Sequence, residues 1–304
     1  MTRTIVAWLA RPPRNEALGA LAGHDHEALG AMPANVALVA DPMREVEFVV
    51  PAWGTAPVLQ ELPALKVVQT LSAGVEWIVD DVPEGVTLCS ARGSRDRAMA
   101  EWVVAALLAD AKRLGPFARA QGRWERRAIR DLAGARVLIL GHGSIGRETE
   151  RLLAPFGCEV VGVARRARDG VHGLDALADL LPGADAVVNL LPLTDATRGL
   201  VDAGVLARMA DGTLYVNAGR GATTDTAALL GELRPGRLRA VLDVVDPEPL
   251  PADHPLWHLP DVIISPHVAG DTAAGGREAW ALVGDQLRRY AAGEPLLNVV
   301  ADGY

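Results

Sequence analysis

The sequence is short of cysteine and of long apolar runs, and each shortage excludes a class of protein. Its two cysteines, Cys89 and Cys158, cannot form a disulfide framework or a four-ligand metal site. The apolar run at residues 5–10 is too short for the core of a signal peptide. The longest apolar helix candidate, residues 102–109, is much shorter than a membrane span. We therefore expect a cytoplasmic protein that binds no metal and no membrane.

Positive charge is also in deficit, which argues against nucleic acid as a partner. Thirty lysines and arginines stand against 38 aspartates and glutamates, so the net charge is −8. Arginines do gather between residues 112 and 130, but Glu125 and Asp131 interrupt that stretch. We interpret the stretch as a solvated surface. An anionic ligand would need locally placed positive groups.

Length and composition favour two compact domains. At about 150 residues per domain, a chain of 304 residues contains two. Half of the residues are hydrophobic and 22% are charged, which is typical of globular proteins.

The first hundred residues alternate short β-branched runs with polar or helical stretches, a pattern that predicts a small parallel α/β layer. An apolar, alanine-rich helix is expected at residues 99–113, so a domain boundary falls near residue 98. We expect residues 1–98 and 271–304 to form a substrate-binding domain. The runs that predict its strands are residues 4–8, 36–39, 47–50, 66–70 and 86–89.

Residues 99–270 are expected to form a dinucleotide-binding domain. Helical segments separate most of its candidate strands, and such spacing requires right-handed crossovers and a parallel sheet covered on both faces. The predicted architecture is therefore doubly wound. The six runs that predict its strands are residues 136–140, 159–163, 185–190, 213–217, 239–244 and 262–265.

A glycine-rich turn follows the first of these runs and opens a helical segment at residues 144–156. In Gly141-His142-Gly143-Ser144-Ile145-Gly146 the glycines permit a tight turn, close approach of a pyrophosphate and close packing of helix on strand. Main-chain N–H groups at the helix start would hold the phosphates. We predict that Gly141, Gly143, Ser144, Ile145 and Gly146 bind a dinucleotide.

The residues after the second run favour NADP(H) over NAD(H). Ala164 occupies the position where an acid would bind the ribose hydroxyls of NAD, and Arg165, Arg166 and Arg168 follow it. A 2′-phosphate would meet guanidinium groups there and no repelling carboxylate. The alternative is that these are ordinary surface arginines of an arginine-rich chain.

Candidate chemical groups lie at the carboxyl ends of three later strands, where ligands bind in such folds. Arg220 lies in Asn217-Ala218-Gly219-Arg220-Gly221, Glu248 follows Asp243, and His267 lies in Pro266-His267-Val268-Ala269-Gly270. Hydride transfer to a 2-oxo acid needs a proton donor, which His267 can be if the Glu248 carboxylate stabilises its cation. Arg220 can bind a carboxylate and a carbonyl through two parallel hydrogen bonds.

Asp243 either binds the nicotinamide amide or supports the loop. Each other histidine, His142 included, is interpreted as a surface or turn residue.

These motifs resemble those of the D-isomer-specific 2-hydroxyacid dehydrogenases. The segments GHGSIG, VNAGRG, LDVVDPEPLP with HPLW, and ISPHVAG occur in the family's order. The resemblance implies a Rossmann cofactor domain inserted into a flavodoxin-like substrate domain. It implies Arg220 as substrate clamp, Glu248 as the acid that orients the histidine, and His267 as general acid/base. It further implies substrate contacts at Ser72, Ala73, Gly74 and Val75, and cofactor contacts at Pro192, Asn217, Ala218, Asp243 and Gly270.

The motif wording is most similar to that of members that reduce glyoxylate or hydroxypyruvate to the D-2-hydroxy acid. Family resemblance also suggests a homodimer formed through the helix at residues 99–113. Trp53 and residues 92–97 are expected near the substrate. Two alternatives stay open, an NAD-dependent phosphoglycerate-type dehydrogenase and a non-catalytic NADP(H)-sensing binding protein. A formate dehydrogenase is disfavoured, because such members carry an amide where Glu248 stands.

Overall fold

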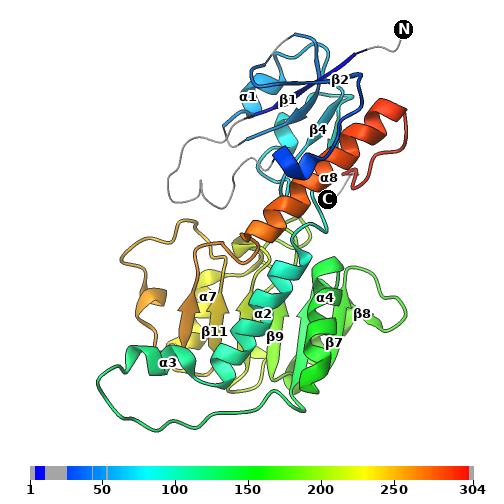
Figure 1. Ribbon diagram of the computed structural model, residues 1–304. Coiled ribbons are helices and arrows are strands. Elements are labelled where there is room, and N and C mark those ends of the chain that lie inside the picture. Colours follow the sequence, from blue (N-terminus) through cyan, green and yellow to red (C-terminus); the bar gives the residue numbers. More distant parts are fainter. Residues whose placement is uncertain (1–3, 11–25, 43, 53, 301–304) are drawn as a thin grey trace. The chain divides into compact units, whose positions relative to one another are not determined.

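The computed structural model describes residues 4–10, 26–42, 44–52 and 54–300. The chain divides into two compact units (Figure 1). Unit 1 comprises Met1–Arg95 and Asp271–Tyr304, and unit 2 comprises Asp96–Gly270. The second unit is therefore inserted into the sequence of the first.

Unit 1 contains a five-stranded parallel sheet with the strand order β2-β1-β3-β4-β5. This order is that of flavodoxin-like folds, in which ligands bind beyond the carboxyl ends of the strands. The strands are β1 (Ile5–Leu9), β2 (Val36–Val39), β3 (Val46–Val50), β4 (Val67–Gln69) and β5 (Thr87–Cys89).

The two faces of the unit 1 sheet are covered by different elements. Helix α8 (Ala273–Ala292) packs Trp280, Val283 and Leu287 against one face, and helix α1 (Ala56–Leu59) packs on the other. Successive strand residues alternate between these two clusters, as the pleat of a strand requires. Phe48, for example, faces α8 and Val49 faces α1.

Unit 2 contains a seven-stranded parallel sheet with the order β12-β11-β10-β9-β6-β7-β8. The chain leaves the central strand β6 in one direction to β7 and β8 and then returns to β9 on its other side. The reversal between β6 and β9 is the switch point at which doubly wound sheets bind ligands. The strands are β6 (Arg136–Leu140), β7 (Glu159–Ala164), β8 (Val171–Gly173), β9 (Ala186–Asn189), β10 (Leu214–Asn217), β11 (Arg239–Leu242) and β12 (Val262–Ile264).

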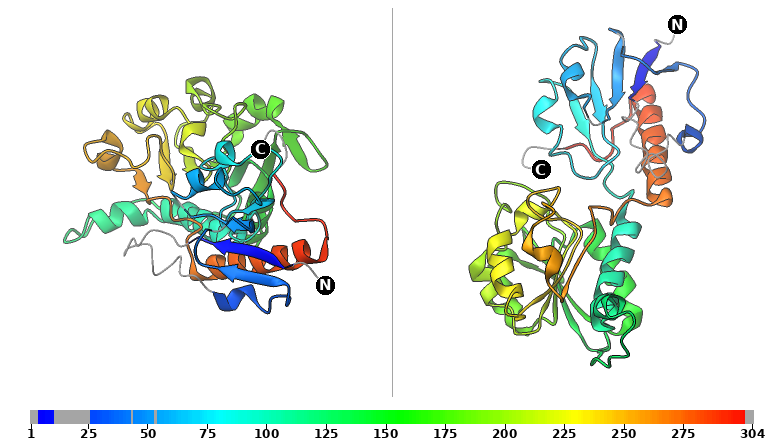
Figure 2. Two further views of the ribbon diagram at one scale, coloured as in Figure 1. Left: turned by 90° about the horizontal axis from the view of Figure 1, so that it is seen from above. Right: turned by 90° about the vertical axis from the view of Figure 1, so that its left-hand side faces the viewer.

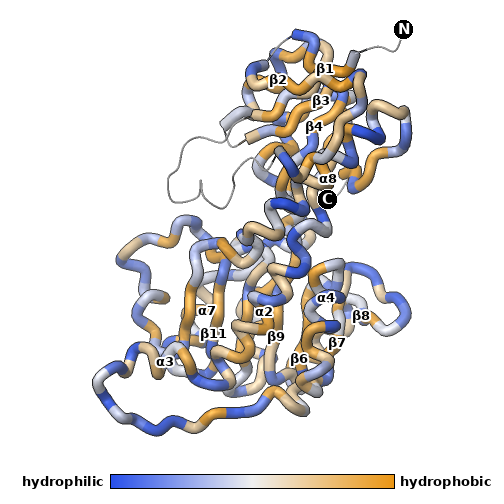
Figure 3. Tube along the Cα trace, viewed as in Figure 1, coloured by the Kyte–Doolittle hydropathy of each residue, from blue (hydrophilic) through white to orange (hydrophobic). Residues whose placement is uncertain are grey.

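Helices cover both faces of this sheet (Figure 2), and apolar residues concentrate on the strands (Figure 3). Helices α2 and α4 pack on one face, and α5, α6 and α7 pack on the other. The helices of unit 2 are α2 (Asp96–Ala111), α3 (Leu114–Arg119), α4 (Ser144–Leu153), α5 (Leu177–Leu180), α6 (Ala203–Ala207) and α7 (Thr226–Leu233). Short 3₁₀ turns lie at His26–Leu29, Val79–Asp81, Ala154–Phe156, Leu174–Ala176, Leu181–Gly183, Gly221–Thr223 and Pro255–His258.

The predicted fold class is confirmed, because the structure has two parallel α/β sheets, one in each unit. All five strands expected in unit 1 and all six expected in unit 2 are present, with ends that differ by up to two residues. Strand β8 was not predicted. It is a three-residue edge strand that contains His172 and Gly173, so it has no apolar run from which a strand could be predicted. Within the described residues, no helix combines the length and apolarity that a bilayer crossing requires.

Candidate active site

The glycine turn joins β6 to α4 and leaves space where a phosphate would lie. Gly141 has φ +94°, and a Cβ there would lie 2.7 Å from the Leu190 carbonyl oxygen. A Cβ at Gly146 would lie 3.0 Å from the carbonyl oxygen of Gly141, so helix and turn pack closely. A Cβ at Gly143 would meet nothing within 4 Å. The three glycines therefore have the separate roles that a dinucleotide turn requires.

The start of α4 presents main-chain donors at this turn. Among the described residues, the amides of Ser144, Ile145 and Gly146 find no acceptor. No side chain caps the helix, since Gly143 is the N-cap residue. These free N–H groups and the positive end of the helix dipole suit an anion. The residues present therefore fit the pyrophosphate of a dinucleotide.

His142 in this turn is buried, with 6% of its surface exposed. Its Nε2 lies 2.7 Å from Glu150 Oε2. A Cβ added to Gly162 would lie only 2.7 Å from two carbon atoms of the His142 ring. The absence of a side chain at Gly162 in β7 thus makes room for the imidazole. His142 is predicted from the sequence as a surface or turn residue. It does lie in a turn, but the surface reading is wrong, because its burial depends on a glycine 20 residues further along the chain.

At the end of β7 the arginines differ in their surroundings. Arg165 and Arg166 are exposed, next to the half-buried Ala164. Arg168 donates a hydrogen bond from Nη2 to the carbonyl of His142. Arg168 therefore links this segment to the glycine turn, and Arg165 and Arg166 directly follow Ala164, the position predicted to lie near the ribose.

Asp243 follows β11 and holds the loop that carries His267. Its Oδ1 accepts hydrogen bonds from Ser265 Oγ at 2.5 Å and from the Val268 amide at 3.0 Å. Its Oδ2 accepts the Ala269 amide at 2.9 Å. Asp243 as a whole residue is 3% exposed. Of the two roles considered from the sequence, support of the loop is therefore visible in the hydrogen bonds themselves.

The same loop gives His267 a backbone conformation that is rare outside glycine. Its φ is +54°, and its amide donates to the Asp243 carbonyl oxygen at 2.8 Å. A left-handed residue costs about 1–3 kcal/mol and persists only where the surroundings hold it. Asp243 fixes both sides of the residue, so that the imidazole projects from the loop and is half exposed.

Glu248 and His267 form a hydrogen-bonded pair. Glu248 Oε2 lies 2.9 Å from His267 Nδ1, and Glu248 Oε1 accepts the Val245 amide at 2.9 Å. The bond to Glu248 raises the pKa of His267, although burial opposes this. Burial would raise the pKa of Glu248, but the bonds from His267 and Val245 outweigh it, so that the pKa is lowered. The pair therefore favours an imidazolium beside a carboxylate, with Nε2 available.

Arg220 lies close enough to act on both members of the pair. Its positive charge contributes to the lowering of the Glu248 pKa. The same charge opposes the rise in the His267 pKa without cancelling it. Gly219 and Gly221 beside it are required by the packing, because a Cβ on either would lie less than 3.0 Å from main-chain atoms. The structure thus brings Arg220, Glu248 and His267 together in unit 2.

Two asparagines that end neighbouring strands shape the loops between the turn and this cluster. Asn217 Oδ1 accepts the Gly219 amide at 3.1 Å, and Asn189 Oδ1 accepts the Leu191 amide at 3.0 Å. Asn189 also donates to Tyr215 and Thr223. Asn189 was not among the predicted site residues, although both asparagines stand at a strand end two residues before the amide they bind. Of the neighbouring predicted contacts, Pro192 is exposed, Ala218 is buried and Gly270 is half-buried.

The loop with Ser72 and Ala73 lies in unit 1, directly after β4. Gly74 and Val75 are buried, and their amides donate to no acceptor in the part of the chain that the structure describes. Main-chain amides without an acceptor in a buried segment are rare in folded proteins, which makes these two suited to an anionic ligand. Residues 92–97 lead from unit 1 into α2, and Trp53 lies outside the described residues.

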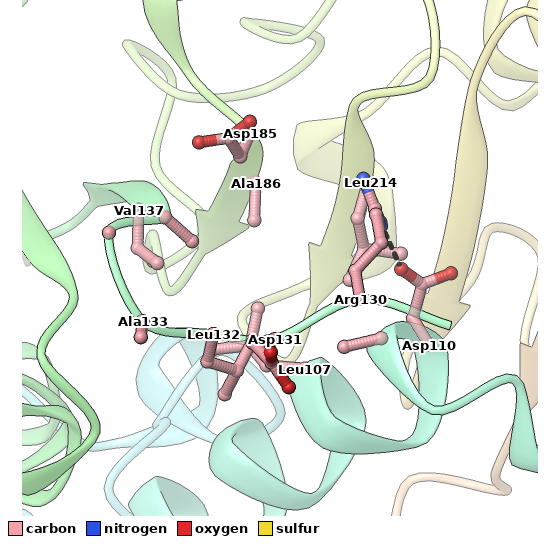
Figure 4. Close-up of a pocket in the computed structure, with 13 residues that line it drawn as sticks. Leu107, Asp110, Arg130, Asp131, Leu132, Ala133, Val137, Asp185, Ala186 and Leu214 are labelled. Carbon is pink, nitrogen blue, oxygen red and sulfur yellow. Dashed lines mark hydrogen bonds and ion pairs between the residues drawn. The ribbon is translucent and has the colours of Figure 1, made fainter. Parts of the chain in front are cut away.

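A cavity of about 240 Å³ lies at the opposite edge of the unit 2 sheet, at the amino ends of β6, β9 and β10 (Figure 4). Leu107, Leu132 and Leu214 line it together with polar residues. Those polar residues already have partners, since Asp110 binds Arg130 at 2.9 Å and Asp185 accepts the Arg136 amide at 2.8 Å. The cavity is therefore separate from the candidate active site.

Comparison with known proteins places this geometry in a family. Residues 104–269 match the model of the D-isomer specific 2-hydroxyacid dehydrogenase, NAD binding domain. A solved D-isomer specific 2-hydroxyacid dehydrogenase from Xanthobacter autotrophicus Py2, in complex with NADPH and MES, is 34% identical. The alignment covers 97% of this chain and 98% of that one, with a TM-score of 0.80. The chain belongs to the D-isomer-specific 2-hydroxyacid dehydrogenase family. The predicted family is therefore confirmed.

Other members of the family are similar over different lengths. An NADPH-dependent glyoxylate/hydroxypyruvate reductase from Sinorhizobium meliloti, solved with NADP and sulfate, is 30% identical over 98% of both chains, with a TM-score of 0.80. D-3-phosphoglycerate dehydrogenase from Mycobacterium tuberculosis is 33% identical over 262 residues, which are 82% of this chain and 49% of that protein. The chain thus spans about half the length of the phosphoglycerate dehydrogenases it matches.

Proposed function

We propose that this family member reduces a small 2-oxo acid of the glyoxylate or hydroxypyruvate type to the D-2-hydroxy acid, with NADPH as reductant. The observation that carries the proposal is the 2.9 Å contact between Glu248 and His267, with the charge of Arg220 beside it. These groups follow β10, β11 and β12 of the sheet whose glycine turn fits a dinucleotide.

His267 is the general acid in this proposal. A bound nicotinamide would supply the hydride, and the carbonyl oxygen that gains negative charge needs a proton. His267 Nε2 donates this proton, because Nδ1 is engaged by Glu248 at 2.9 Å. Glu248 fixes the orientation of the ring and stabilises its cation. The raised pKa of His267 keeps part of the imidazole protonated near neutral pH.

Positive and amide groups hold the substrate in this proposal. Arg220 binds the carboxylate and the carbonyl of the 2-oxo acid through its two-pronged guanidinium, which a lysine could not reproduce. The amides of Gly74 and Val75 bind the carboxylate, since they have no acceptor among the described residues. Fixing the acid in this way orients the carbonyl carbon for hydride transfer.

NADP(H) is the proposed cofactor. Arg165 and Arg166 are exposed at the end of β7, and no acid stands at Ala164 to repel a 2′-phosphate. The relatives from Xanthobacter and Sinorhizobium were solved with NADPH and NADP, respectively.

A panel of substrates tests the function and separates it from its alternatives. We expect NADPH oxidation with glyoxylate or hydroxypyruvate, followed by absorbance, and chiral chromatography should identify a D-hydroxy acid where the product is chiral. Oxidation of 3-phosphoglycerate with NAD would favour the phosphoglycerate-type alternative, which the 33% identity to that dehydrogenase supports. Tight NADP(H) binding without turnover of any acid would instead indicate a cofactor-sensing binding protein.

A homodimer formed through unit 2 is also proposed. Helix α2 carries half-buried Trp102 and Leu108 in addition to its buried residues. All of residues 121–130 are exposed, including a fully exposed Trp124. Both ends of this exposed segment are anchored, because α3 binds Pro260 through Arg119 and Arg130 binds Asp110. An anchored segment that leaves a tryptophan in solvent suits a surface covered by a second copy. Sedimentation should show a dimer, and Trp124→Ser should shift it toward monomer.

A further inference from the structure

The loop that follows β4 in unit 1 contains a chain of side-chain hydrogen bonds. Thr70 Oγ1 donates to the nearer of its two acceptors, the Ser72 carbonyl oxygen, at 2.8 Å. Ser72 Oγ donates to the Gly74 carbonyl oxygen at 2.7 Å. Trp77 Nε1 donates to Ser72 Oγ at 3.3 Å. Side chains thus hold two carbonyls of a segment that forms neither helix nor strand.

Holding these carbonyls fixes the direction of the amides that follow them. A trans peptide is planar, and its C=O and N–H bonds point in opposite directions. The bond from Ser72 to the Gly74 carbonyl therefore turns the Val75 N–H away from Ser72. The Ser72 carbonyl is held in the same way by Thr70 and by the Ala91 amide at 2.9 Å. The loop is thereby ordered before any ligand arrives, which lowers the entropy that binding would cost.

Trp77 completes this arrangement because a hydroxyl group rotates freely. Ser72 Oγ has one proton, which goes to Gly74, and two lone pairs that can accept. The indole N–H occupies one of them and so selects the orientation that sends the proton to Gly74. The ring itself is half-buried and packs against the apolar cluster that contains Ile78 and Leu88. The donor is therefore fixed in position.

We infer that Trp77 is a positioning residue for the substrate carboxylate, acting through Ser72 on the Val75 amide. The inference rests on the proposed function, since it assumes that this loop binds the carboxylate of the 2-oxo acid. Trp77 acts on the carboxylate only through Ser72 and contacts no reacting atom. Its effect is on affinity for the acid, while the proton transfer at His267 is unaffected.

The test is Trp77→Phe, which keeps an aromatic ring and removes the indole N–H. Loss of one neutral hydrogen bond predicts a rise of about two- to tenfold in KM for the 2-oxo acid. We expect kcat and KM for NADPH to change less than about twofold. Trp8→Phe is the matched control, because the Trp8 indole donates to the Ala40 carbonyl oxygen at 3.2 Å, elsewhere in unit 1. It should leave every kinetic constant unchanged.

A second variant separates positioning from a merely structural role. Ser72→Ala removes both bonds, so adding Trp77→Phe to it should raise KM no further, whereas independent effects would multiply. If Trp77→Phe leaves KM for the acid at its original value, or lowers kcat alone, the positioning role is overturned and the proposed function stands. If the unmodified protein reduces no 2-oxo acid, the proposed function fails and this inference fails with it.

Discussion

Two loops of the molecule are ordered in opposite ways. In unit 1, the hydroxyls of Thr70 and Ser72 bind main-chain carbonyls, and the amides of Gly74 and Val75 are left without described acceptors. In unit 2, the carboxylate of Asp243 binds the amides of the His267 loop. The first loop therefore leaves main-chain amides available for the ligand that we propose. The second uses its backbone to fix a side chain. Donor side chains suit a loop that binds an anion, and an acceptor suits a loop that presents an acid.

The largest expected effect comes from removing the side chain that the second loop presents. His267→Asn should lower turnover by about 10²- to 10⁴-fold, the usual effect of a lost general acid. Binding of NADPH, measured by fluorescence titration, should survive. A turnover close to that of the unmodified protein would show that His267 is not the acid. The second loop would then not serve to present a catalytic side chain.

Removing the acceptor that orders the second loop should be the next most severe change. Asp243→Ala leaves the amides of Val268 and Ala269 without their carboxylate, at a cost of about 2–4 kcal/mol in the free energy of unfolding. Displacement of His267 should lower turnover by about 10²-fold. Urea denaturation and steady-state kinetics measure the two effects. Ser265→Ala is the matched control, since it removes one of the three donors and should be milder in both.

Glu248→Gln should change the pH dependence of reduction. In the proposed mechanism the protonated His267 is the acid, so the rate should fall as pH rises through its pKa, which Glu248 raises. A neutral amide lowers that pKa, so the fall should move to lower pH, with about tenfold less activity near neutrality. The pH profile of kcat/KM measures the shift. An unmoved profile would show that the carboxylate does not control this proton.

The smallest expected effect touches neither loop. Arg165→Ala and Arg166→Ala should each raise KM for NADPH by up to about tenfold and leave KM for NADH nearly unchanged, because only NADPH carries the 2′-phosphate. Arg198→Ala provides a control with an equal change of charge away from β7. Equal effects on both cofactors would indicate surface arginines without selectivity.

Sequence patterns predicted the sheets well because buried parallel strands are apolar runs. Residues 136–140 and 36–39 match β6 and β2 to the residue. The predicted helix at residues 99–113 is α2, which starts earlier, at Asp96, and ends at Ala111. Strand β8 is not predicted from the sequence, because only two of its residues, Val171 and Gly173, are buried. Local periodicity identifies buried elements and does not identify a short edge.

The candidate site was predictable where chemistry is tied to a motif. Arg220, Glu248 and His267 each follow a strand, and parallel topology brings such ends together. The supporting bonds were not predictable in the same way. The three donors to Asp243 lie 22 to 26 residues away, and the link from Trp77 to Ser72 depends on a turn that no periodicity marks. Such bonds are set by the tertiary structure.

The exposed segment at residues 121–130 contains four arginines, at positions 123, 126, 127 and 130. Trypsin cleaves after arginine where the backbone is accessible and unfolded enough to enter its cleft, which an irregular exposed stretch allows. A free copy of the chain is therefore expected to be nicked here first, into an N-terminal fragment of about two fifths of the chain and a C-terminal fragment of about three fifths. A dimer that covers this segment would protect it from trypsin. Dilution should then accelerate the cut, and gel electrophoresis alone would measure the dissociation of the dimer.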